Sequence, residues 1–95
     1  YTAMEFEWDE AKRQRNLAKH GLDFGLAHRL FAGRHVVTAP NPYPDEERYV
    51  TTGIVDEIYL TVAWTRRAAA VRIISFRRAR NAERRTHRAL HGERA

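Results

Sequence analysis

Several residues of this chain have side chains that could together cleave a phosphodiester. RNA is cut without a metal ion when its 2′-hydroxyl attacks the adjacent phosphorus. That reaction requires a base for the hydroxyl, cations for the charge that develops on the phosphorane, and an acid for the leaving 5′-oxygen. His20 and Glu47 are the candidate acid/base pair, and the candidate cations are Arg48, Arg72 and Arg77. The sequence does not show which of the pair is the base.

Each of these residues also has a structural interpretation. Lys19 and His20 precede Gly21, where cations favour the C-terminus of a helix. Glu47 and Arg48 are also what an ordinary charged strand start contains. If His20 and Glu47 are catalytic, they must converge with the arginines on one concave surface.

An arginine-rich segment over residues 71–78 is a predicted strand. Strict alternation of side chains predicts that Arg72 and Phe76 face one side of the sheet, and Ile73 and Arg77 the other. An arginine inside a sheet is costly without an anionic partner. Either each arginine has an acidic neighbour, or the strand lines a groove for phosphate, and the pattern leaves both open.

The charge of the chain is concentrated in its last third. The 95 residues contain 17 Lys and Arg against 12 Asp and Glu, a net charge of +5. Residues 66–95 hold ten arginines and two acidic residues, which favours nucleic acid or an acidic protein as the partner. The alternative is a solvated basic helix. No apolar run is long enough for a membrane span, and the absence of cysteine is consistent with a cytoplasmic protein.

Neither a cofactor motif nor a metal site is evident in the sequence. There is no Walker loop, no Gly-x-Gly-x-x-Gly, no Gly-x-Ser-x-Gly and no His-Glu-x-x-His. His87 and His91 have a spacing that could hold a metal, but Glu83 is the one nearby carboxylate that could be a third ligand. We therefore expect no cofactor and no metal ion.

The pattern of apolar residues predicts elements in the order β-α-α-β-β-β-β-α. Strands are expected over residues 5–8, 36–38, 48–53, 58–65 and 71–76, and helices over 10–19, 24–31 and 82–91. Asp9, Asp23 and Asn81 are the predicted N-caps, and the three prolines lie in a rigid loop over residues 40–44. This order predicts one α+β domain over residues 4–95 with an antiparallel sheet. Residues 1–3 precede Met4 and are expected to be a cloning remnant.

The motifs, in their order along the chain, resemble the BrnT toxin family over about residues 5–85. The resemblance rests on Phe6-Glu7-Trp8-Asp9, Lys12, Asn16, Lys19-His20-Gly21, Phe24, Ala27, Phe31, Glu47-Arg48, Gly53, the run Arg72 to Ala79, and Glu83-Arg84. Two departures concern packing and capping: Phe76 stands where the family commonly has a small residue, and Arg80-Asn81 where a threonine is common.

This resemblance implies a type II toxin with a RelE-like fold, in which two N-terminal helices pack on an antiparallel sheet and a helix ends the chain. It implies RNA cleavage that stops translation. It also implies a BrnA-type antitoxin whose ribbon-helix-helix domain binds operator DNA, so that the toxin reaches DNA only through the complex.

We therefore predict a metal-independent endoribonuclease in which His20, Glu47, Arg48, Arg72 and Arg77 are catalytic. Lys19, Arg78 and Arg84 are predicted to bind RNA, although Arg78 and Arg84 could instead hold the antitoxin. The alternative is a non-catalytic basic module that binds nucleic acid or regulates. A third possibility is an interaction module whose basic helix binds an acidic partner.

Overall fold

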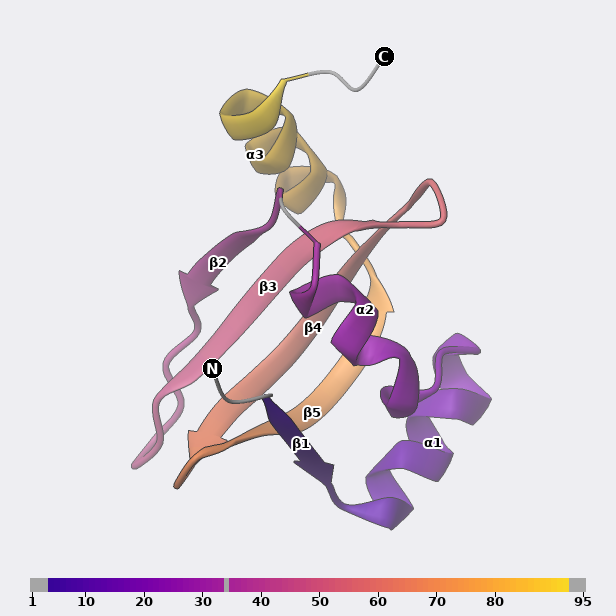
Figure 1. Cartoon of the computed structure of the whole chain (residues 1–95), viewed down its shortest axis with the longest axis vertical. Coiled ribbons are helices and arrows are strands. Elements are labelled where there is room, and N and C mark those ends of the chain that lie inside the picture. Colours follow the sequence, from indigo (N-terminus) through magenta and orange to yellow (C-terminus); the bar gives the residue numbers. More distant parts are fainter. Residues whose placement is uncertain (1–3, 34, 93–95) are drawn as a thin grey trace.

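The computed structural model describes residues 4–33 and 35–92, and Figure 1 shows their arrangement. The α+β class is confirmed, with a C-terminal helix and one five-stranded sheet in the order β1-β5-β4-β3-β2. The expectation for residues 1–3 lies outside the described residues. The elements are β1 (Glu5–Trp8), α1 (Glu10–His20), the 3₁₀ helix η1 (Phe24–Leu26), α2 (Ala27–Phe31), β2 (Val37–Pro40), β3 (Arg48–Val55), β4 (Ile58–Arg67), β5 (Ala70–Arg78) and α3 (Asn81–His91).

The sheet is mixed, so the prediction of an antiparallel sheet is wrong for one strand. β2, β3, β4 and β5 pair antiparallel with their neighbours, whereas β1 pairs parallel with β5, from Glu5 beside Ala70 to Trp8 beside Ile73. Strands joined by short hairpins must be antiparallel. β1 is followed by helices instead of a hairpin, so no tight turn fixes its direction, and it adds to the free edge of β5.

The predicted caps of the first helix are confirmed. The Asp9 carboxylate accepts hydrogen bonds from the backbone N–H groups of Ala11 and Lys12, and Gly21 ends the helix with a left-handed φ of 71°. The predicted second helix is divided into η1 and α2. Asp23 caps η1 by accepting a hydrogen bond from the N–H of Gly25.

The predicted cap of α3 is wrong by one residue. Arg80 occupies the N-cap position and Asn81 is the first helical residue. The Glu83 carboxylate accepts a hydrogen bond from the Arg80 N–H at 2.8 Å, so this side chain closes the first turn from within the helix. The Asn81 side chain instead accepts a hydrogen bond from Arg84.

One face of the sheet carries the apolar core. Phe24 of η1 and Leu30 of α2 are buried with side chains from β4 and β5, and Tyr49 and Val55 of β3 pack against them. Figure 1 shows α2 in front of the sheet and α3 at one end of it. The buried core residues are Phe24, Ala27, Leu30, Leu60, Val62, Trp64, Val71, Ile73 and Phe76.

β5 contains a β-bulge that strict alternation does not predict. Its pairing with β4 passes from Ser75 opposite Ala63 to Ile73 opposite Trp64, so that Ile74 is an extra residue with no partner of its own. A bulge reverses the alternation of side chains on the strand that contains it.

The bulge decides which residues of β5 share a face. Ile73 and Phe76 are both 1% exposed in the core, although three positions separate them. The prediction that Arg72 and Phe76 share a face is therefore wrong. Arg72 is paired with Thr65 and Arg77 with Thr61, so both arginines lie on the face opposite the core.

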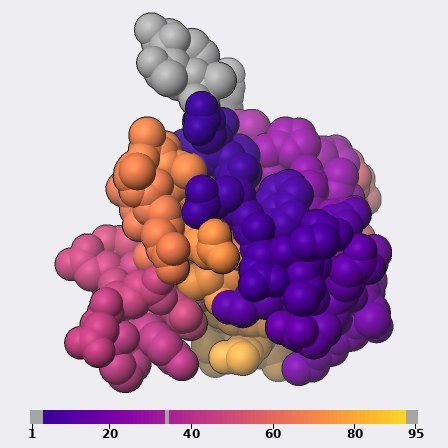
Figure 2. Space-filling model, turned by 90° about the horizontal axis from the view of Figure 1, so that it is seen from below, coloured from indigo at the N-terminus to yellow at the C-terminus, as the bar shows by residue number. Residues whose placement is uncertain are grey.

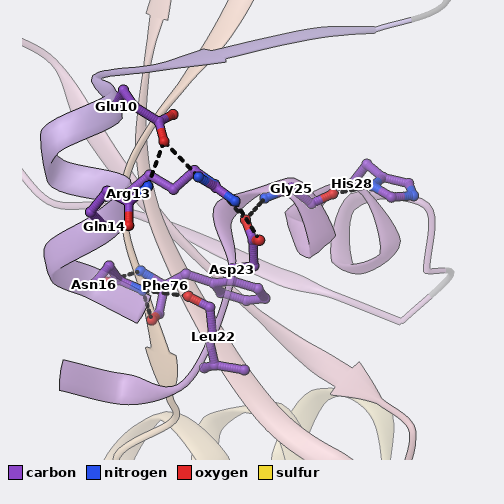
Figure 3. A network of polar contacts seen from close by, with 9 residues as sticks. All are labelled: Glu10, Arg13, Gln14, Asn16, Leu22, Asp23, Gly25, His28 and Phe76. Atoms are coloured by element: carbon purple, nitrogen blue, oxygen red, sulfur yellow. Dashed lines mark hydrogen bonds and ion pairs between the residues drawn. The ribbon is translucent and has the colours of Figure 1, made fainter. Parts of the chain in front are cut away.

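α1 is attached to β5 beyond the point where β1 ends. The buried Asn16 side chain donates hydrogen bonds to the carbonyls of Leu22 (3.0 Å) and Phe76 (2.8 Å), and accepts one from the Phe76 N–H (3.1 Å). Figure 3 shows these contacts beside the bidentate ion pair of Arg13 with Asp23. Asn16 thereby satisfies both backbone groups of Phe76 that a neighbouring strand would otherwise pair.

Candidate active site and nucleic-acid interface

A row of polar side chains crosses four strands on the face opposite the core. Glu7 of β1 is paired with Arg72 of β5, Arg72 with Thr65 of β4, and Thr65 with Arg48 of β3. Neighbouring strands are about 4.8 Å apart, so the backbones at Arg48 and Arg72 are separated by about 10 Å. Two long cationic side chains therefore flank one hydroxyl; we call Glu7, Arg72, Thr65 and Arg48 the arginine row.

Arg48 is held at the start of β3 by an acidic and an aromatic neighbour. Its Nε donates to Glu46 Oε1 at 2.7 Å, and its guanidinium lies 3.8 Å from the ring centre of Tyr43. The Arg48 hydrogen bond lowers the pKa of Glu46, with further lowering by the charges of Arg48 and Arg67. Glu46 is therefore an anionic partner that keeps the Arg48 side chain in place.

Fewer of the hydrogen-bond donors of Arg72 have a partner. Its Nη1 donates to Glu7 Oε2 at 3.0 Å, and Glu7 is itself 41% exposed. Among the described residues, the Arg72 side chain makes no other hydrogen bond. Because a guanidinium carries five N–H donors, Arg72 keeps donors for a further anion.

Arg77 has a stronger partner. It forms a bidentate pair with Glu83 of α3, at 2.8 Å from Nη1 and 3.0 Å from Nη2, and both side chains are largely buried. Burial opposes ionisation of Glu83, but hydrogen bonds from Arg77 and the Arg80 N–H outweigh it and lower its pKa to about 2. Thr61 also donates to this carboxylate at 3.0 Å. These contacts attach α3 to the sheet at Arg77 and Thr61.

Two cavities meet at Glu47, one of about 490 Å³ and the other of about 540 Å³. Both are lined by Asp45, Glu46, Glu47 and Tyr49. The larger is completed by Thr65, Arg66 and Arg67, and the smaller by Pro40, Pro42, Tyr43 and Arg48. Figure 2 shows the segment around residues 40–50 as a lobe at one corner of the molecule, beside the strands nearer the C-terminus.

Glu47 is an exposed residue held at both its side chain and its backbone. Its Oε1 accepts a hydrogen bond from the Tyr49 hydroxyl at 3.2 Å, and its carbonyl accepts one from the Thr65 hydroxyl at 2.6 Å. The second bond connects Glu47 directly to the arginine row.

His20 lies elsewhere. It lines a separate cavity of about 170 Å³ with Leu60, Arg78 and Asp56, beside the turn between β3 and β4. Glu47 precedes the opposite end of β3, about 23 Å away for a strand of this length. The prediction that His20 and Glu47 converge on one phosphate is therefore wrong. The two residues lie near opposite ends of β3, and their order in the sequence does not reveal that separation.

The residues predicted to bind RNA also lie on different parts of the molecule. Lys19 is exposed at the end of α1, Arg78 borders the His20 cavity, and Arg84 lies on α3. The structure places Arg48 and Arg72 on either side of Thr65, and Glu47 reaches this row through its backbone carbonyl, while its carboxylate bonds the Tyr49 hydroxyl. Lys19 and Arg84 lie on other elements.

Four residues at this end of the sheet were missed by the sequence reasoning: Glu7, Tyr43, Glu46 and Thr65. Two of them had a usable signal. Glu46 is two residues before Arg48, and Thr65 falls on the polar side of β4, so alternation could have assigned both to the face of Arg48. The register that places Glu7 beside Arg72 had no such signal.

Among residues 4–33 and 35–92, no group of three or more His, Cys, Asp or Glu side chains is arranged to hold a metal ion. No helix in the same ranges is long and apolar enough to cross a bilayer.

The fold and this face define a small α+β domain that carries partly exposed arginines on the face opposite its core, with cavities beside Arg48, an arrangement suited to binding a phosphodiester chain. Residues 8–83 match the family described as the ribonuclease toxin BrnT of type II toxin–antitoxin systems. The match covers most of the chain, which therefore belongs to the BrnT family. No curated protein sequence matches the chain. Family membership gives it RNA as substrate and an antitoxin as partner, as the sequence predicted.

Proposed function

We propose that this toxin is a metal-independent endoribonuclease that stops translation, with its active site at the arginine row and Glu47. The observation that carries the proposal is the direct cross-strand pairing of Arg48, Thr65 and Arg72 on the face opposite the core. Two guanidiniums beside one hydroxyl can hold a phosphate and neutralise the charge that develops on it. The RelE-like arrangement, with two N-terminal helices on the sheet, forms part of this proposal.

In the proposed mechanism, Arg48 and Arg72 donate hydrogen bonds to the non-bridging oxygens of the cleaved phosphate. Glu47 stands between the two cavities and accepts the proton of the 2′-hydroxyl. The 2′-oxygen forms a bond to phosphorus as the bond to the 5′-oxygen breaks, and solvent protonates the leaving oxygen. The products are a 2′,3′-cyclic phosphate and a 5′-hydroxyl.

The other predicted residues have different roles in this proposal. Arg77 positions α3 through Glu83, and Lys19 and His20 lie in the last turn of α1, where basic side chains are favoured. Lys19, Arg78 and Arg84 contact the RNA backbone away from the cleaved phosphate.

We further propose that the partner is a BrnA-type antitoxin with a ribbon-helix-helix domain, and that the toxin reaches operator DNA only within that complex. Both proteins act in the cytoplasm, where the RNA is translated. The positive charge of the toxin, +5, supports an acidic segment in the antitoxin. Co-expression of the pair should yield a complex, whereas the toxin alone should arrest growth.

The test of the active site is cleavage of purified RNA in the presence of EDTA. We expect wild type to cut, and Arg72→Ala and Glu47→Gln to lose about 10²-fold or more in rate while remaining folded. RNA binding without cleavage by wild type would favour the non-catalytic module instead. Loss of activity in His20→Ala, with Glu47→Gln active, would move the site to the His20 cavity.

A further inference from the structure

The loop that joins β2 to β3 has a feature that the proposed chemistry does not use. Tyr43 is 55% exposed even though the Arg48 guanidinium lies 3.8 Å from the centre of its ring. A large aromatic side chain that is covered by a cation and still open to solvent can stack on a further planar group. We call residues 40–47, from the last residue of β2 to the residue before β3, the proline loop.

The proline loop holds Tyr43 in a fixed place. Asn41 donates its N–H to the carbonyl of Arg48 at 2.7 Å, and Tyr43 and Glu46 exchange backbone hydrogen bonds at 3.2 and 3.0 Å. Pro40 and Pro42 restrict the backbone on the approach to Tyr43. A binding surface that is already ordered loses little conformational entropy when a ligand binds.

We propose that the cavity of about 490 Å³ beside Tyr43 binds the nucleobase of the ribonucleotide whose 2′-hydroxyl attacks. This inference rests on the proposed function, because Arg48 lines the cavity and also belongs to the arginine row. A base that stacks against Tyr43 and the prolines brings its own ribose toward Glu47 and its 3′-phosphate toward Arg48. Stacking on an aromatic side chain is favourable for any base and increases with the area of the base.

The polar groups of the cavity select among bases. Glu46 is committed to Arg48 and Arg67, and Glu47 is assigned to the 2′-hydroxyl. Asp45 also lines the cavity, and among the described residues its carboxylate has no hydrogen-bond or ion-pair partner. A carboxylate only accepts hydrogen bonds. Guanine presents two adjacent donors, N1–H and the 2-amino group, whereas uracil flanks its single N–H with two carbonyl oxygens. The subsite therefore favours guanine and disfavours uracil.

The test uses toxin separated from its co-expressed antitoxin and four DNA oligonucleotides, each with one ribonucleotide at the same position. Cleavage can occur only at that ribonucleotide, so the four rates compare guanine, adenine, cytosine and uracil directly. We expect wild type to cut at guanosine about tenfold faster than at uridine. Tyr43→Leu should lower the guanosine rate about tenfold and the uridine rate much less, and Tyr43→Phe should restore most of the difference.

A second substitution tests the carboxylate. Asp45 has a left-handed φ of 62°, which asparagine also tolerates, so Asp45→Asn keeps the turn while it removes the charge. It should reduce the preference for guanosine over adenosine. Leu90→Ala, at an exposed position on α3, is the matched surface control and should leave all four rates as in wild type.

Equal wild-type rates for all four bases, or an equal loss on all four in Tyr43→Leu, would overturn the subsite and leave the proposed ribonuclease intact. If no oligonucleotide is cut, the proposed function fails, and binding of guanosine and uridine 3′-monophosphates still tests the subsite. Tighter binding of the guanosine nucleotide that is lost in Tyr43→Leu would support it, and equal binding would overturn it. Loss of antitoxin binding in Tyr43→Leu, with base preference unchanged, would make the loop a partner contact and overturn the subsite.

Discussion

Arg72 and Arg77 lie on the same strand and the same face of the sheet, yet their surroundings are opposite. Arg72 donates one hydrogen bond to Glu7, which is 41% exposed. Arg77 donates through both Nη atoms to Glu83, which is 21% exposed and receives further hydrogen bonds from Thr61 and Arg80. One arginine has donors left for a ligand, and the other is part of the packing between α3 and the sheet.

The comparison shows that an arginine's position in a basic strand does not decide its function. What decides it is how many donors its acidic partner occupies and whether water can replace that partner. A phosphate can compete with Glu7 because the pair is partly exposed and rests on one hydrogen bond. It competes poorly with Glu83, since the chelating geometry and the burial would both have to be lost.

The largest expected effect is on the rate of RNA cleavage, which should depend on Arg72 far more than on Arg77. Arg72→Ala should reduce the rate of RNA cleavage by 10²-fold or more, because a cation beside the transition state is removed, and change the free energy of unfolding by less than about 1 kcal/mol. The measurements are single-turnover cleavage and urea unfolding of the same preparation. A cleavage rate within threefold of wild type would remove Arg72 from the active site.

The reverse result is expected for Arg77. Arg77→Met should lower the free energy of unfolding by about 2 kcal/mol, because Glu83 is left largely buried without its cation. Urea unfolding at neutral pH measures this loss. The double variant Arg77→Met with Glu83→Gln is the matched control and should recover part of it, since no unpaired charge remains. A single variant as stable as wild type would contradict the structural role of the pair.

A smaller effect is expected on the pH dependence of stability, through Glu83, the partner of Arg77. The folded pKa of Glu83, about 2, lies below its ordinary value of 4.5, so its stabilisation is fully present above pH 4.5 and is lost as the pH falls toward 2. Allowing for solvent screening, we expect a loss of about 1–2 kcal/mol over this window. Subtracting the pH profile of Glu83→Gln from that of wild type isolates this contribution from other carboxylates. Coincident profiles would show that the pair does not stabilise the fold.

The same face shows how far the sequence could predict the structure. Local signals were sufficient for α1, because Asp9 and Gly21 act on the residues beside them, and for the hairpin strands, whose period is two. They were insufficient for β5. A bulge at Ile74 depends on how two strands fit together, and it moved Arg72 and Arg77 to a common face that the sequence pattern had assigned to only one of them.

In the candidate site, too, local features could be predicted from the sequence and contacts between distant segments could not. The residue types and the family were predictable, because the motifs are short and in order along the chain. The partner of Arg72 was not, because its contact with Glu7 spans 65 residues, and the contact of Asn16 with Phe76, which spans 60 residues, was equally hidden. Such contacts follow from the register of distant strands, which also placed His20 and Glu47 at opposite strand ends.

The smallest expected effect is on the salt dependence of RNA binding. Each arginine–phosphate contact on single-stranded RNA contributes about −0.7 to the slope of log affinity against log salt concentration. Arg72→Ala and Arg48→Ala should each flatten the slope by about that amount, and Arg84→Ala should do so if it also contacts the backbone. Arg77→Met should leave the slope unchanged, measured at a temperature at which the variant is fully folded. An equal flattening by Arg77→Met would mean that RNA displaces Glu83, and the two arginines would then be equivalent despite their different partners. A wild-type affinity that does not depend on salt would instead make the whole face an antitoxin surface or a solvated one.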